Sequence, residues 1–147
     1  MEFREATLDH EDICLEMMED FYAMNGYQFY EVQASRNFEE FIQNDQLGKF
    51  WIINFSGKIA GYLILTFGYS FEYGGRDAFI DELFLKEEFR NRGIGGLILE
   101  SVDFFARKHG VKAIHLEMEK ENLIENKLCV KSGFKSNDRS LLTKIVE

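Results

Sequence analysis

Hydrophobic and polar positions in the first half of the chain predict three strands and two helices. Residues 2–7 alternate as a strand does, and residues 36–45 have the spacing of a short helix. The apolar runs 49–55 and 59–69 flank a Ser-Gly-Lys turn and predict a β-hairpin. Between the first strand and the short helix, a longer helical stripe consists of Ile13, Met17, Phe21 and Met24.

The second half of the chain alternates strands with helices. Residues 77–85 and 112–119 predict strands, and residues 93–109 between them predict an amphipathic helix. Residues 122–132 predict another helix, and residues 141–146 predict a last strand. The whole chain reads β-α-α-β-β-β-α-β-α-β-β, which indicates a mixed α/β fold with strand-helix-strand units in its second half.

Composition favours a single domain over residues 1–147. The chain is 46% apolar and 15% aromatic, so its 147 residues can bury one sizeable core. No apolar run approaches the ~20 residues of a membrane span, and the first ten residues lack the apolar segment of a secretory signal. We therefore expect a cytoplasmic protein with no membrane partner.

Charge and metal-ligating residues exclude several classes of function. The two cysteines and three histidines are too scattered for a metal cluster, so we expect no metal. A net charge of −9 opposes nucleic-acid binding over most of the surface. An anionic ligand would need a local basic patch, for which Arg90 and Arg92, with Lys127 and Lys131, are the candidates.

Three glycines mark the start of the helix at 93–109. Each of Gly93, Gly95 and Gly96 costs about 1 kcal/mol relative to alanine if it is helical. They leave the backbone N–H groups of the first turn open to an anion, where the helix dipole is positive. A tight strand-to-helix turn is the structural alternative. The P-loop and the dinucleotide fingerprint G-x-G-x-x-G are both absent.

Together, segments 78–85, 90–96, 112–119 and 122–134 resemble the GNAT family of N-acetyltransferases in order and spacing. The resemblance implies a single-domain GNAT-like acyl-CoA N-acyltransferase fold, with a mixed central sheet flanked by helices. It also implies acetyl-CoA as the co-substrate. Gly133-Phe134 resembles the family's Gly-Phe at the start of a strand, and it can equally be a helix stop followed by a core aromatic residue.

The resemblance assigns candidate residues to coenzyme A. The loop matched by Asn91 to Gly96 wraps the pyrophosphate in this family, and the strand residues Leu83, Phe84 and Leu85 pair with the pantetheine arm. Asn122 resembles the asparagine that helps to position pantetheine, and it could also be a helix N-cap. The candidate cofactor-binding set is Leu83, Phe84, Leu85, Arg90, Asn91, Arg92, Gly93, Ile94, Gly95, Gly96 and Asn122.

This sequence departs from the family at Cys129. The family usually has a tyrosine there, whose hydroxyl acts as general acid toward the departing thiolate, and Glu125 replaces a commonly small residue. Cys129 is most simply a small buried hydrophobe. Because a thiol of pKa about 8.5 leaves readily near neutral pH, we expect a slower enzyme rather than an inactive one.

Acetyl transfer to an amine requires a base, and Asp81 and Glu82 are the candidates. An ammonium group with a pKa near ~10 must lose a proton, often through water, before it attacks. On a regular strand the two side chains point to opposite faces, unless a bulge intervenes. Asp81 ranks first, because it matches the glutamate base of polyamine acetyltransferases in this family. His115 is a weaker alternative.

The acceptor favoured by the sequence is a small cationic amine. Two rival functions stay open: acetylation of a protein lysine or N-terminus, and a non-catalytic acyl-CoA binding module. A homodimer is compatible with the sequence. The candidate acceptor pocket is aromatic and acidic and consists of Tyr22, Tyr27, Phe29, Tyr30, Tyr69, Asp20, Glu31 and Glu72.

Overall fold

The computed structural model describes residues 1–119 and 121–147, without the side chains of residues 124 and 125. The change noted at Glu125 thus lies outside the described residues. The described chain consists of two compact units, Met1–Glu117 and Met118–Glu147. In order, the elements are β1 (Glu2–Glu5), the 3-10 helix η1 (Leu8–His10), α1 (Glu11–Met24), α2 (Glu31–Ile42), β2 (Gly48–Phe55), β3 (Lys58–Ser70), β4 (Gly75–Leu85), the 3-10 helix η2 (Glu87–Phe89), α3 (Ile94–Lys108), β5 (Ala113–His115) and α4 (Leu123–Lys131).

Five strands of the first unit form one mixed sheet in the order β1-β2-β3-β4-β5. The first four strands are antiparallel to their neighbours, and β5 is parallel to β4. The predicted strand 112–119 is shorter than expected, because β5 pairs with β4 over only three residue pairs, from Asp77↔Ala113 to Phe79↔His115. The mixed sheet itself confirms the predicted fold class.

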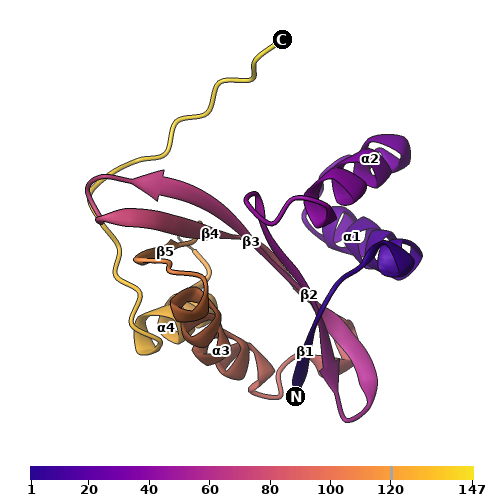
Figure 1. Cartoon of the computed structure of the whole chain (residues 1–147). Helices are drawn as coiled ribbons and strands as arrows, with labels where there is room; N and C mark the ends of the chain where they lie inside the picture. Colours follow the sequence, from indigo (N-terminus) through magenta and orange to yellow (C-terminus); the bar gives the residue numbers. More distant parts are fainter. Residues whose placement is uncertain (120) are drawn as a thin grey trace. The chain divides into compact units, whose positions relative to one another are not determined.

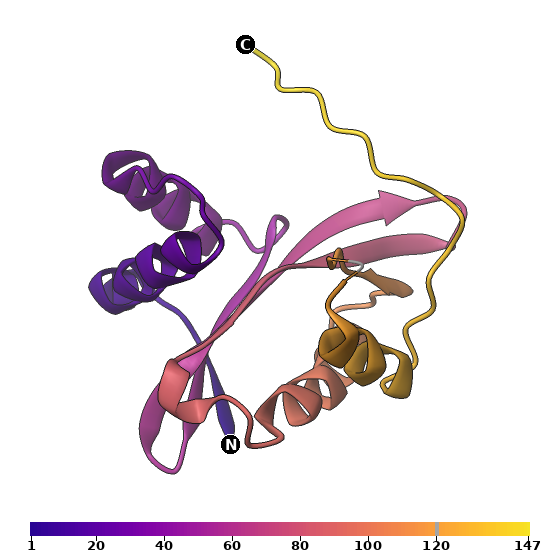
Figure 2. The same cartoon turned by 180° about the vertical axis from the view of Figure 1, so that it is seen from behind.

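Helices cover both faces of this sheet. One face carries Phe50, Tyr62 and Phe84 and packs against α1 and α2. The opposite face carries Trp51, Leu63 and Leu65 and packs against the apolar side of α3, including Ile98. Figure 1 shows the two N-terminal helices on one side of the long strands and α3 on the other, and Figure 2 shows the same layers from behind. Because successive side chains of a strand point to opposite faces, the sheet has one hydrophobic core on each face.

The sequence prediction is wrong about the start of one helix and about the strands after residue 132. Helix α2 begins at Glu31, five residues before the predicted start. Glu31 and Ala34 are good helix formers, but the irregular aromatic run before them hid this start in the sequence pattern. The strands expected from Gly133-Phe134 and over residues 141–146 do not form in the described chain. A strand requires a hydrogen-bonded neighbour, whereas the apolar residues of this segment stay exposed, Leu142 to 90%.

Candidate active site

A β-bulge in β4 brings the two candidate bases together. Glu82 pairs with Ile64 of β3 and Ile80 pairs with Leu65, so that Asp81 is the extra residue between them. A bulge of this kind bends the strand and changes the direction of its side chains. The strict alternation that would send Asp81 and Glu82 to opposite faces is thereby interrupted.

Two tyrosine hydroxyls hold the Glu82 carboxylate. Tyr62 Oη of β3 donates a hydrogen bond to Glu82 Oε1 at 2.7 Å, and Tyr22 Oη of α1 donates one to Glu82 Oε2 at 3.0 Å. Tyr62 is fully buried in the core under α1, whereas Tyr22 and Glu82 are half-buried. Glu82 is therefore fixed from both sides, by residues that are far apart in the sequence.

Burial makes both carboxyls more basic than free ones. Burial raises the pKa of Asp81, although its outer side is exposed. Burial also raises the pKa of Glu82, and the negative charge of Asp81 adds to this, while the hydrogen bonds from Tyr62 and Tyr22 oppose it. Burial, followed by the Glu82 charge and hydrogen bond, raises the pKa of Tyr22 to about 12, so Tyr22 stays a neutral donor. A carboxyl with a raised pKa is better matched to accept a proton near neutral pH.

Part of the predicted aromatic pocket adjoins this carboxylate pair. The Tyr22 ring makes edge contacts with Tyr27, at 6.1 Å between centroids, and with Phe29, at 5.6 Å. Tyr69 instead pairs with Phe71 on the β3–β4 hairpin, and Tyr30 is exposed. The acidic residues predicted for the same pocket, Asp20, Glu31 and Glu72, are all exposed. Tyr22 thus links the carboxylates to an aromatic cluster on the α1 side.

The loop between β4 and α3 is held by its two arginines. Arg90 Nε donates to the Leu85 carbonyl at 2.8 Å, and its guanidinium lies 5.6 Å from the centre of the Phe84 ring. Arg92 Nη1 donates to the Glu88 carbonyl at 3.3 Å and stays exposed. Asn91, with φ 60°, has the left-handed backbone conformation that only a few non-glycine residues adopt. The loop is therefore an ordered turn, in which Arg90 supports the backbone.

The N-terminus of α3 fits an anionic group. Gly93, at φ 76°, is the N-cap, and no side chain caps the helix or places an acidic group in its first turn. By contrast, the first turn of α1 carries Glu11 and Asp12. Ile94 is buried and anchors this turn to the core. The positive end of the helix dipole thus faces no carboxylate of its own turn, as a phosphate-binding terminus requires.

The strand residues predicted to meet pantetheine form the end of β4. Leu83 and Leu85 pack on the α3 side, Phe84 packs on the α1 side, and all three pair with β3. On the other edge of β4, pairing with β5 stops at Phe79. The sheet of the first unit therefore leaves this edge of residues 81–85 without a β5 partner.

His115 has a partner away from Asp81 and Glu82. Its Nε2 lies 3.0 Å from Asp77 Oδ2, across the parallel β4–β5 pair. The imidazole also contacts the rings of Tyr73 and Phe79, at 5.3 and 4.9 Å between centroids. These contacts join β5 to β4 and its hairpin.

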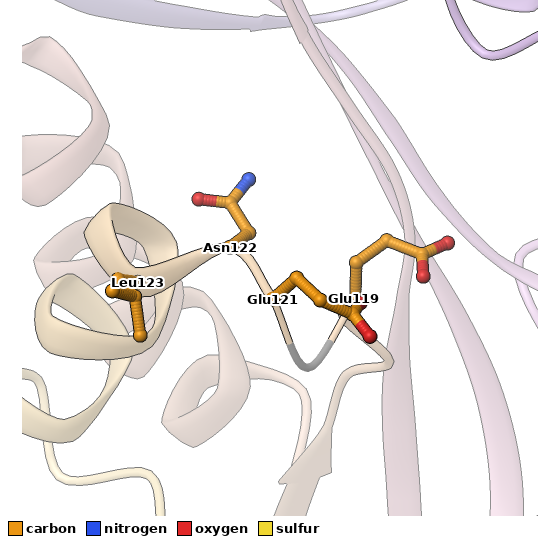
Figure 3. A pocket seen from close by; sticks show the side chains of 4 residues that line it. All are labelled: Glu119, Glu121, Asn122 and Leu123. Carbon is orange, nitrogen blue, oxygen red and sulfur yellow. The ribbon is translucent and has the colours of Figure 1, made fainter.

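Asn122 and Cys129 belong to the second unit. Asn122 directly precedes α4, and its carbonyl accepts hydrogen bonds from the backbone and side-chain amides of Asn126. Cys129 is buried. Figure 3 shows the four residues that line a pocket at this turn, Glu119, Glu121, Asn122 and Leu123. Two of its four lining residues are acidic, which disfavours an anion there.

Tyr62 was missed as a site residue by sequence reasoning. It lies in the apolar run Ile59–Leu65, which reads as an ordinary core strand. The available signal was its hydroxyl, because a buried phenol requires a hydrogen-bond partner.

Among the described residues, no three or more His, Cys, Asp or Glu side chains gather as metal ligands. No described helix has the length and apolar character needed to cross a membrane. The site is thus built from a bulged strand bearing two carboxyls, followed by an ordered loop and an uncapped helix N-terminus. These are the features that the sequence predicts for an acyltransferase with a phosphate-bearing acyl donor.

Comparison with known proteins identifies the family. The sequence profile described as "Acetyltransferase (GNAT) family" matches residues 11–134. The chain therefore belongs to the GNAT family of acetyltransferases, which confirms the predicted family and enzyme class. Acetyl-CoA is the co-substrate of this family, so the predicted co-substrate is confirmed with it. A search of curated proteins finds no match.

Solved structures share the fold across the whole chain. An integron cassette protein from the mobile metagenome of Cole Harbour Salt Marsh is 28% identical, with a TM-score of 0.86 over 99% of this chain and 90% of that one. A predicted acetyltransferase from Clostridium acetobutylicum, solved with acetyl-CoA, is 18% identical, with a TM-score of 0.79 over 97% and 95%. The enzyme AAC(6')-Iy, bound to a bisubstrate analogue of coenzyme A and acetylneamine, is 17% identical, with a TM-score of 0.81 over 99% and 97%.

An Arg92→Ala variant should bind acetyl-CoA more weakly, with the largest loss at low salt. Arg92 is exposed in the loop, and its removal takes away a positive charge that salt would otherwise screen. The measurement is calorimetric titration with acetyl-CoA at low and high ionic strength. An affinity loss that does not depend on salt would mean that this guanidinium faces away from the phosphates.

Proposed function

We propose that this protein acetylates a primary amine of a small cationic molecule, with Asp81 as the general base. The observation that carries the proposal is the bulge in β4, which places Asp81 next to Glu82 beside the aromatic cluster of Tyr22. The carboxylates would attract a cation, and the aromatic rings would offer it their faces. The bulge supports a site that uses both carboxyls, because it interrupts the alternation that would point them to opposite faces.

Different residues of this chain would bind the acetyl donor and activate the acceptor amine. The backbone of residues 91–96 would hold the pyrophosphate of acetyl-CoA, and that of Leu83 to Leu85 would align the pantetheine arm. Bound acetyl-CoA supplies the thioester carbonyl that a neutral amine attacks. Asp81, directly or through water, would take the proton that the ammonium must lose. Its raised pKa and its exposed side suit that role.

We favour a small amine over a protein substrate because the candidate acceptor surface is compact. Tyr22, Tyr27 and Phe29 gather around one end of α1, close to Glu82. AAC(6')-Iy, which shares this fold, is an aminoglycoside N-acetyltransferase, so its acceptor is a small molecule. A protein lysine or N-terminus stays the alternative acceptor. We also propose that residues 1–147 act as one domain, since the family profile spans residues of both units.

Release of free coenzyme A thiol over a panel of amines tests this function. The panel should contain aminoglycosides, polyamines, amino acid amides and lysine peptides, with acetyl-CoA as donor. We expect release with small polycations and little with peptides. Acetyl-CoA binding without thiol release for any amine would favour the rival function, a non-catalytic acyl-CoA binding module.

A Cys129→Ala variant should keep an appreciable rate. The thiol is buried, and we assign it no proton transfer. A Cys129→Tyr variant would add the phenol usual in the family and raise turnover if the site has room, although overpacking commonly costs 1–3 kcal/mol. Thiol release and melting temperature are measured together for both variants. Loss of activity in a folded Cys129→Ala protein that still binds acetyl-CoA would make the thiol itself the acid.

A further inference from the structure

Glu82 is held more firmly than its partner Asp81. Each of its two carboxyl oxygens accepts a hydrogen bond from a different tyrosine, one on α1 and one on β3. Asp81 is the unpaired residue of the bulge and is exposed. The two neighbouring carboxyls thus have different surroundings, and they should differ in their roles.

The Tyr62 hydroxyl has no packing role that phenylalanine could not fill. Its ring stacks 5.3 Å from Phe50 and lies 5.7 Å from Phe84, within an apolar core. A buried hydroxyl costs free energy unless it forms a hydrogen bond, and here the partner is Glu82. The Tyr62–Glu82 bond is therefore the contact that explains a tyrosine at this position.

Burial and the Asp81 charge raise the pKa of Glu82, and the hydrogen bonds from Tyr62 and Tyr22 oppose that rise by favouring the ionised form. A carboxylate accepts at both oxygens, whereas a carboxylic acid must use one oxygen as a donor. The titratable groups that face this network are Tyr22 and Cys14 of α1, Tyr62 of β3 and Asp81 of β4. Within the described chain, no lysine or arginine forms an ion pair with either carboxyl. The tyrosine hydroxyls are thus the groups that stabilise the Glu82 charge.

We propose that Tyr22 and Tyr62 are positioning residues that keep Glu82 as a carboxylate, so that Asp81 is the member of the pair that exchanges a proton with the acceptor. The negative charge of Glu82 would then help to attract the ammonium group of the acceptor. The role of Asp81 toward the acceptor rests on the proposed function. The ionisation of Glu82 by Tyr22 and Tyr62 does not, because it is a property of the protein without substrate.

The sign of the expected effect follows from the hydrogen bonds. Both bonds stabilise the ionised form of Glu82, so removing a donor raises the pKa of that carboxyl. Below the new pKa, Glu82 is neutral and Asp81 loses its negative neighbour. Activity should then be lost at a higher pH than in the wild type.

The first experiment is an NMR titration of the Glu82 side-chain carboxyl carbon in the full chain without acetyl-CoA. Tyr62→Phe should move its midpoint upward by about one to two pH units, the size expected when a hydrogen bond to a charged group is lost. Tyr22→Phe should move it in the same direction, and the double variant further. The control is Tyr27→Phe, whose ring adjoins Tyr22 at the surface, and it should leave the midpoint unchanged.

Unchanged midpoints in both single variants would overturn the proposal. If Tyr62→Phe fails to fold, the half-buried Tyr22→Phe still decides the question, since its ring is kept and only an oxygen is lost.

The second experiment follows kcat/KM against pH with the best amine of the panel. In Tyr62→Phe the acidic limb should move upward by a similar amount, while the rate on the high-pH plateau stays within about 3-fold of the wild type. In a Glu82→Gln background, adding Tyr62→Phe should produce no further shift, because the group that it acts on has gone. A further shift of equal size in that background would refute the assignment to Glu82.

No thiol release from the wild type with any amine would refute the proposed function, and the NMR result would still decide the ionisation of Glu82.

Discussion

A Gly95→Glu variant is expected to lose measurable acetyl-CoA binding while it remains folded. Gly95 lies in the first turn of α3, where the helix has no side-chain cap and no acidic residue. A glutamate there brings a three-carbon side chain and a negative charge to the place proposed for the pyrophosphate. Charge repulsion and steric exclusion act in the same direction, so we expect affinity to fall by at least about 100-fold, the equivalent of roughly 2.7 kcal/mol.

The fold should tolerate this change, because glutamate is a better helix former than glycine and suits the first turn of a helix. Phe104→Glu is the matched control, since it adds the same charge to the same helix at an exposed position further along. Calorimetric titration with acetyl-CoA and a thermal melt are measured for both variants. Wild-type affinity in folded Gly95→Glu would remove the α3 N-terminus from the binding site.

The loop and helix at residues 90–108 could be predicted because their signals are local. Glycines at the start of a helix, a 3.6-residue apolar stripe and Gly110 after the last turn all refer to one segment of chain. The candidate loop residues Asn91 and Gly93 then adopt positive φ angles, as a turn of this kind requires.

The bulge at Asp81 could not be predicted in the same way. The run Ile80-Asp81-Glu82-Leu83 has no glycine or proline to mark an irregularity. The extra residue exists only relative to β3, because a bulge is a property of two paired strands. Sequence reasoning could name both carboxyls and could state that a bulge would matter, but the register that brings them together is a tertiary feature.

The error over residues 141–146 has a related cause. The apolar and β-branched residues there are compatible with a strand, but a strand forms only where a neighbour supplies its hydrogen bonds. In the described chain Leu141, Leu142, Ile145 and Val146 are all exposed. Local pattern alone therefore overestimated the regular structure at this end of the chain.

An Asp81→Asn variant is expected to lose at least about 100-fold in kcat at neutral pH, the lower end of the range for a general base. Its affinity for acetyl-CoA should change by less than about 3-fold, since the carboxyl is proposed to act on the acceptor. The variant should fold with no loss of melting temperature at pH 7. Burial raises the pKa of Asp81, so the folded state disfavours its ionised form, and a neutral amide removes that cost.

The pH dependence of this loss distinguishes a base from a residue that only binds. An amine with a pKa near ~10 is about 0.1% neutral at pH 7, and each higher pH unit raises that fraction nearly tenfold. The deficit of Asp81→Asn should therefore shrink toward pH 10, as free amine replaces the need for a base. Glu82→Gln should show a milder defect, because Asp81 remains to accept the proton. The measurement is thiol release over pH 6–10 for both variants and the wild type. If Glu82→Gln has the larger and pH-dependent defect while Asp81→Asn stays near the wild-type rate, Glu82 is the base and the two carboxyls exchange the roles proposed for them.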